Sequence, residues 1–256
     1  LLNLYDDDIL KDIQKEVEAS CLGVIRKRFE AQANKNSSIY IDPVLYNMPL
    51  PIGDRADSVQ DLPVALMGTR FPVEGNKVRL FMQWGEGLKA QHLDMDLSCR
   101  VAYPNRTEHC SYSQLVIAGC KHSGDIINIP HMVGTAEYIE IDIPTLDELG
   151  AKYVSFTCNA YSHGSIAPNL IVGWMAAEYP MHISQSTGVA YDPSCVQHQV
   201  RITQGLNKGL VFGVLDVEKR EVLWLEMSFG GQIVQGLDVK NVEALMAKLD
   251  SKLNIG

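Results

Sequence analysis

Hydrophobic residues near the start of the chain recur at the spacing of an α-helix. The positions three or four residues apart are Ile9, Ile13, Val17, Cys21 and Val24. This pattern predicts an amphipathic helix from about Asp6 to Ala33. Acidic residues at its beginning and the basic run Arg26–Arg28 near its end suit the helix dipole. We expect the apolar stripe to pack on its own domain, or alternatively on a partner helix.

From Lys77 onward the pattern changes to short apolar runs separated by turn residues. Such runs, with glycine, proline and asparagine between them, are typical of an antiparallel sandwich or barrel. The predicted strands are Val78–Trp84, Leu93–Tyr103, Ser111–Ile117, Glu137–Ile143, Lys152–Tyr161, Leu170–Glu178, Val196–Thr203, Gly209–Asp216 and Glu221–Glu226.

A second helix is predicted from about Asp238 to Leu253. Asp238 is a favourable N-cap, and apolar residues follow it at helical spacing. The sequence therefore predicts a mainly β protein, an antiparallel β-sandwich with an N-terminal and a C-terminal helix. We divide it into a helical arm (residues 1–36), a proline-rich irregular or β lead-in (37–76), and the sandwich with its C-terminal helix (77–256).

Three acidic stretches lie within the predicted strands and loops. Side chains alternate between the two faces of a strand, so Asp94 and Asp96 share the face opposite their aliphatic neighbours. Asp125 is the last residue of the second stretch, His122–Asp125. In the third, Glu137–Asp142, Glu140 and Asp142 share the polar face. Glu137 has core-facing parity, so we expect it at the strand's start, turned outward.

These stretches together resemble the TerD family of tellurium-resistance and stress-response proteins. The segments that carry the resemblance are Val78–Trp84, Leu93–Ser98, His122–Asp125 and Glu137–Ile143, within a match from about residue 77 to 230. The resemblance implies a calcium-binding β-sandwich in the tellurite and general stress response of bacteria. Its implied metal ligands are Asp94, Asp96, Asp125, Glu137 and Asp142. The family has further aspartates where this chain has no acidic residue between Ile126 and Ala136, so we expect one Ca²⁺ site or a vestigial one.

Overall charge and cysteine usage narrow the function classes. The net charge of −9 argues against nucleic-acid binding through phosphate neutralisation. No run of 18 apolar residues is present, so we expect no stable membrane insertion. The six cysteines are scattered without a CxxC pair, which favours reduced thiols in a cytoplasmic protein.

Three functions from different classes agree with these patterns. The first is a TerD-like calcium-binding scaffold domain without catalytic activity. The second is a metal-free protein-interaction module of a larger bacterial or phage assembly, which contacts protein partners through the flanking helices. The third is a metal-dependent hydrolase that uses the acidic cluster with His122. The sequence does not determine the oligomeric state.

Two further motifs have alternative interpretations. Asp94–Ser98 resembles the phosphoaspartate motif of haloacid-dehalogenase-type phosphatases, but no buried strand of an α/β fold precedes it. A zinc site could be drawn from His109, Cys110, Cys120 and His122, although their spacing matches no standard zinc motif.

Overall fold

A computed structural model describes residues 7–32, 40, 67–161, 170–177, 182–184, 188–190, 196–202, 208–230 and 237–250. The chain divides into two compact units, residues 1–42 and residues 43–256. Helix α1 (Asp7–Gln32) belongs to the first unit, close to the predicted bounds. Every other described helix and strand belongs to the second unit.

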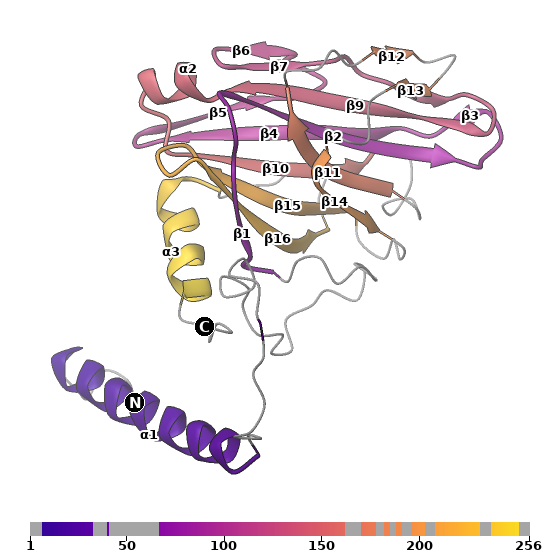
Figure 1. The fold of residues 1–256 in the computed structure, drawn as a ribbon. Helices are drawn as coiled ribbons and strands as arrows, with labels where there is room; N and C mark the ends of the chain where they lie inside the picture. Colours follow the sequence, from indigo (N-terminus) through magenta and orange to yellow (C-terminus); the bar gives the residue numbers. More distant parts are fainter. Residues whose placement is uncertain are drawn as a thin grey trace. The chain divides into compact units, whose positions relative to one another are not determined.

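Two antiparallel sheets make up most of the second unit (Figure 1). In the described residues, the first sheet has the order β1 (Arg70–Pro72), β16 (Glu221–Phe229), β15 (Gly209–Asp216), β10 (Tyr153–Ala160), β4 (Met95–Tyr103) and β5 (Arg106–Cys110). The second has the order β14 (Val196–Ile202), β11 (Leu170–Ala176), β2 (Lys77–Glu86), β9 (Val133–Asp142), β7 (Cys120–His122) and β6 (Val116–Ile117). Two small pairs join β12 (His182–Ser184) to β13 (Gly188–Ala190) and β3 (Gln91–His92) to β8 (Asn128–Ile129).

The main hydrophobic core lies between the two sheets. Alternate residues of β2, β9 and β11 meet alternate residues of β4, β10 and β16 in one buried cluster. Trp174 of the second sheet and Trp224 of the first have ring centroids 6.3 Å apart and are fully buried. This packing confirms the predicted antiparallel β-sandwich.

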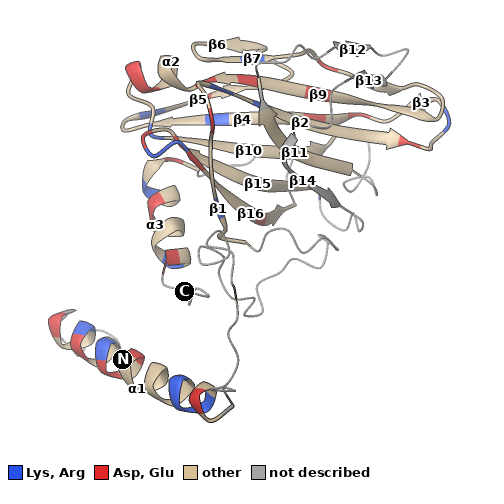
Figure 2. Cartoon of the chain, in the orientation of Figure 1, with Lys and Arg blue, Asp and Glu red and all other residues tan. Residues whose placement is uncertain are grey.

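Helix α3 (Val239–Asp250) covers part of the outer face of the first sheet (Figure 1). Val242, Met246 and Leu249 pack there against outward-facing residues of β15 and β16. The Asp238 carboxylate accepts a hydrogen bond from the Asn241 N–H at 2.9 Å, which confirms the predicted N-cap. Charged residues lie mainly along the helices and turns, whereas the strands are mostly uncharged (Figure 2).

Several predicted boundaries differ from the structure. Residue Ile143 begins the short helix α2 (Ile143–Glu148) instead of ending a strand, because Asp142 caps that helix and Pro144 lies in its first turn. The predicted strand Ser111–Ile117 shrinks to β6, because Ser111 and Gln114 close a tight turn through paired backbone hydrogen bonds. No helix in the described residues combines the length and the apolar character needed to cross a bilayer.

Candidate metal centre

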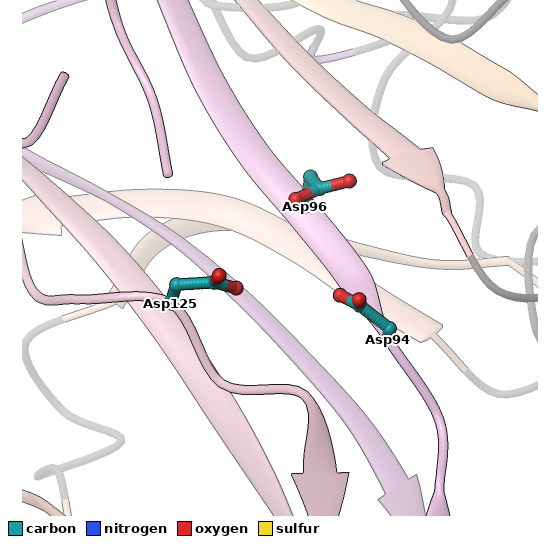
Figure 3. A group of neighbouring side chains, drawn as sticks. All are labelled: Asp94, Asp96 and Asp125. Atoms are coloured by element: carbon teal, nitrogen blue, oxygen red, sulfur yellow. The ribbon is translucent and has the colours of Figure 1, made fainter. Parts of the chain in front are cut away.

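Three aspartates converge beside the start of β4 (Figure 3). Asp94 precedes the strand, Asp96 lies on it, and Asp125 lies on the loop between β7 and β8. One carboxylate oxygen from each lies within 4.8 Å of the others. Calcium binds oxygen ligands at about 2.4 Å, so two oxygens on one ion can lie up to about 4.8 Å apart. The spacing of this aspartate triad therefore suits a single divalent cation.

The neighbouring strands fix the first two aspartates in place. Asp96 lies opposite Asn159 of β10, whose side-chain amide donates a hydrogen bond to its carboxylate at 3.0 Å. The carbonyl of Asp94 accepts from the backbone N–H of Tyr161 at 3.1 Å. Both aspartates are almost completely buried, whereas Asp125 is exposed. The triad thus joins the start of an interior strand, β4, to a loop that solvent can reach.

The loop that carries Asp125 is held by hydrogen bonds on both sides. Ser123 pairs with the backbone of Tyr138 through its N–H (2.9 Å) and its hydroxyl oxygen (3.0 Å). Gly124 has a φ of 124°, a conformation that side chains disfavour, and its N–H donates to Nδ1 of His122 at 3.0 Å. These contacts hold the loop in the conformation that brings the exposed Asp125 carboxylate next to Asp94.

Glu137 lies beneath the triad and does not belong to it. Its two carboxylate oxygens accept hydrogen bonds from the N–H groups of Leu97 and Ile126, each at 2.9 Å. These are the residues directly after Asp96 and Asp125. The expectation that Glu137 lies at the strand's start and turns outward is wrong, because it lies within β9 and is fully buried. Its buried carboxylate instead ties together the two segments that carry the aspartates.

His122 completes this support. Since Nδ1 accepts from Gly124, the ring hydrogen is on Nε2, which donates to the carbonyl of Leu97 at 3.0 Å. The same nitrogen lies 3.5 Å from a carboxylate oxygen of Glu137. Burial lowers the pKa of His122, but the hydrogen bond and charge of Glu137 raise it, and the net change is upward.

The triad concentrates negative charge. Burial, followed by the charges of Glu137, Asp94 and Asp125, raises the pKa of Asp96 to about 7. Burial and the charge of Asp125 also raise the pKa of Asp94. No lysine or arginine of the described segments forms a salt bridge with Asp96 or Asp125. A bound cation would neutralise this repulsion.

Asp142 lies apart from the triad and has a structural role. Its carboxylate caps α2 by accepting the Thr145 N–H at 3.1 Å, and it lies 3.5 Å from Nζ of Lys77. The Thr145 N–H is the main cause that lowers the pKa of Asp142. Thus, of the five ligands implied by the resemblance, the structure brings together Asp94, Asp96 and Asp125, while Glu137 and Asp142 have other partners.

The two alternative motifs fit this geometry poorly. Cys110 and His109 are consecutive residues of β5 and point to opposite faces, so they cannot both ligate one zinc ion with Cys120 and His122. The residues around Asp94 belong to an antiparallel sheet, not to the parallel α/β sheet in which the phosphoaspartate motif is found.

Sequence reasoning missed Asn159, the hydrogen-bond partner of Asp96. A signal for it is present, because Ser155, Thr157 and Asn159 are polar at every second position of a predicted strand. In the pairing of β10 with β4, they lie directly opposite Arg100, Ser98 and Asp96, respectively. This polar face continues the site along the sheet.

Comparison with known proteins adds no family assignment. No protein-family model matches the chain, and no curated protein matches it either.

Proposed function

We propose that the chain is a non-catalytic domain that binds one divalent cation, calcium by preference, through Asp94, Asp96 and Asp125. The observation that carries the proposal is the convergence of three carboxylates, two of them buried, on one point. Calcium takes six to eight oxygen ligands, so water and backbone carbonyls complete its coordination. Magnesium requires closer octahedral geometry, and zinc favours nitrogen and sulfur, which the triad lacks.

The proposal extends to a TerD-like role in stress response or tellurite resistance, as a binding or scaffold module in the cytoplasm. The acidic stretches that resemble the TerD family support it, and the triad is drawn from two of them. The four described cysteines of the sandwich are buried free thiols, which agrees with a reducing compartment. Cys110, a described cysteine close to His122, is fully buried and therefore closed to a substrate, which favours binding over hydrolysis.

Calcium titration by calorimetry tests the proposal. We expect one ion per chain for the wild type and no binding for Asp125→Asn. Asp142→Asn is the matched control, since it removes the same charge from a residue that caps α2 instead of facing the triad. Loss of binding in Asp142→Asn with retention in Asp125→Asn would reject the assigned ligand set.

A metal-free interaction module is the second candidate, and helix α1 favours it. Ile9, Ile13, Val17 and Val24 are each about half exposed along α1. An exposed apolar stripe of this kind suits a partner helix. Under this function, a calcium-free chain retains its partner in a gentle pull-down, and deletion of α1 releases it. Recovery of the lone chain in both cases would remove this candidate.

A further inference from the structure

A cavity of about 240 Å³ lies on the outer face of the first sheet, beside the aspartate triad. Strands β10, β4 and β5 form its floor, and the side chains that line it include Asp96, Ser98, Arg100, His109, Tyr112 and Thr157. Most of these side chains are polar. Pockets for drug-sized ligands measure about 300–1,000 Å³, so this cavity suits a smaller polar molecule.

One end of the cavity is a cationic donor site. Arg100 of β4 lies directly opposite His109 of β5, and both line the cavity. In the part of the chain that the structure describes, neither side chain forms a hydrogen bond or an ion pair. A guanidinium without a protein partner on a cavity wall offers paired donors to an oxyanion such as phosphate.

The middle of the cavity offers acceptors instead. The hydroxyl of Thr157 donates to the carbonyl of Ser98 at 3.2 Å, and the two hydroxyl oxygens lie 2.5 Å apart. With Thr157 so engaged, the Ser98 hydroxyl donates to it. Both hydrogens are therefore used, and the remaining lone pairs can accept hydrogen bonds from hydroxyl groups of a ligand.

The acidic end lies far enough away not to repel an anion at Arg100. Asp96 and Arg100 are four residues apart on β4, which corresponds to about 13 Å along a strand. Between them lie the Ser98 and Thr157 hydroxyls. The ring of Tyr112, about half exposed, adds a flat apolar wall to the cavity.

We propose that this cavity binds a small hydroxylated phosphate ester, with the phosphate on Arg100 and His109 and the hydroxyls on Ser98 and Thr157. The order of donors and acceptors along the cavity carries this assignment. Asp96 is the one residue that the cavity shares with the cation site. The proposed ligand contacts other residues, so its binding does not require the cation.

Calorimetry on the full chain in EDTA tests the site with three probes: glycerol 3-phosphate, inorganic phosphate and glycerol. We expect glycerol 3-phosphate to bind more tightly than inorganic phosphate, and glycerol not to bind at millimolar concentration. Arg100→Gln should weaken both phosphates by at least about tenfold, since it removes a charge-assisted contact. Arg106→Gln removes the same charge from β5 outside the cavity and should leave both affinities unchanged.

Thr157→Val provides a second variant that separates the two halves of the ligand. It should weaken glycerol 3-phosphate and leave inorganic phosphate unchanged. Calcium binding by Arg100→Gln should equal that of the wild type, so failure of the phosphate site is distinguishable from failure of the cation site. The proposal is overturned if the wild type binds neither phosphate, or if Arg100→Gln and Arg106→Gln bind them equally.

Discussion

At the scale of single residues, the buried Glu137 carboxylate explains how two distant segments meet at one cation site. Its oxygens accept hydrogen bonds from Leu97 and Ile126, the neighbours of Asp96 and Asp125. Outer-layer contacts of this kind orient the groups that touch a metal and tune their affinity. Glu137 is therefore a positioning residue for the triad.

Substitution Glu137→Gln should weaken calcium binding by about 10–100-fold, the usual effect of losing such support. The amide keeps one acceptor oxygen but places an NH₂ group against a backbone N–H, so unfolding free energy should also fall by about 1–3 kcal/mol. Calcium calorimetry and urea unfolding measure the two effects. The exposed Glu148→Gln on α2 is the control, and equal calcium affinity in both variants would contradict the role of Glu137.

Stability of the cation-free chain should fall as pH rises from about 5 to 7.5. The pKa of Asp96 is raised to about 7, so the folded state holds a proton that the unfolded state has already released above an ordinary aspartate pKa near 4. The raised pKa values of Asp94, Glu137 and His122 act in the same direction. Stabilisation by calcium should grow over this range, because the ligands must be deprotonated.

Urea unfolding in EDTA at a series of pH values measures this dependence. Asp96→Asn should flatten the fall in stability, since it removes a carboxyl group whose pKa is raised to about 7 in the folded state. Identical pH profiles for the wild type and Asp96→Asn would show that Asp96 does not titrate in this window.

At the scale of elements, the site depends on one loop conformation as much as on the strands. Gly124 adopts a φ of 124°, and a Cβ added there would meet no atom within 4 Å. Any effect of a side chain at this position therefore comes from backbone strain alone. The same is true of Gly150, which has a φ of 76°. It lies just before the start of β10, at the end of that strand away from Asn159 and the triad.

Gly124→Ala and Gly150→Ala should each lower the unfolding free energy by about 1–2 kcal/mol. Only Gly124→Ala should also weaken calcium binding, because its strain displaces the loop that carries Asp125. Urea unfolding and calcium calorimetry on both variants check this. A normal calcium affinity in Gly124→Ala would mean that the loop does not determine the site.

Local patterns predicted the elements well where periodicity was strong. The bounds of α1, β2, β10 and β15 follow from apolar spacing along the chain. The short strands β5 and β7 were missed because their sequences are mixed and polar, and pairing with β4 and β9 forms them. Strand pattern alone did not reveal that Asp142 lies outside the triad, because its capping of α2 depends on a short helix that this pattern concealed.

The candidate site was predictable in composition but not in geometry. Strand parity correctly placed Asp94 and Asp96 opposite the core residues Leu93, Met95 and Leu97. Parity also indicated that Glu137 faces the core, and only the fold shows which backbone N–H groups compensate its burial. Contacts between residues 40 positions apart, such as Leu97 with Glu137, follow from how the two sheets pack together.

At the scale of the whole molecule, the sandwich core determines whether the site exists at all. Phe156 is fully buried between the sheets, and its ring centroid lies 5.9 Å from that of Phe212. Residues of both sheets contribute to this one cluster. Loss of packing there should destabilise the sandwich as a unit.

Phe156→Ala should lower the unfolding free energy by about 3–5 kcal/mol, the usual effect of removing a buried aromatic ring. Phe29→Ala on α1 removes an exposed ring and should change it by less than about 0.5 kcal/mol. Urea unfolding followed by tryptophan fluorescence measures both. Similar losses in the two variants would contradict the assignment of the core.

The most direct test of the cation site is thermal unfolding of the wild type and of the double variant Asp94→Asn with Asp96→Asn, in EDTA and in calcium. Burial and mutual repulsion disfavour both charges, so in EDTA the double variant should be at least as stable as the wild type. Calcium at about 100 times its Kd should raise the Tm of the wild type by about 5–10 °C and leave that of the double variant unchanged. In calcium, the wild type should then be the more stable of the two. Equal calcium responses in the two proteins, or none in either, would contradict a cation site at the aspartate triad.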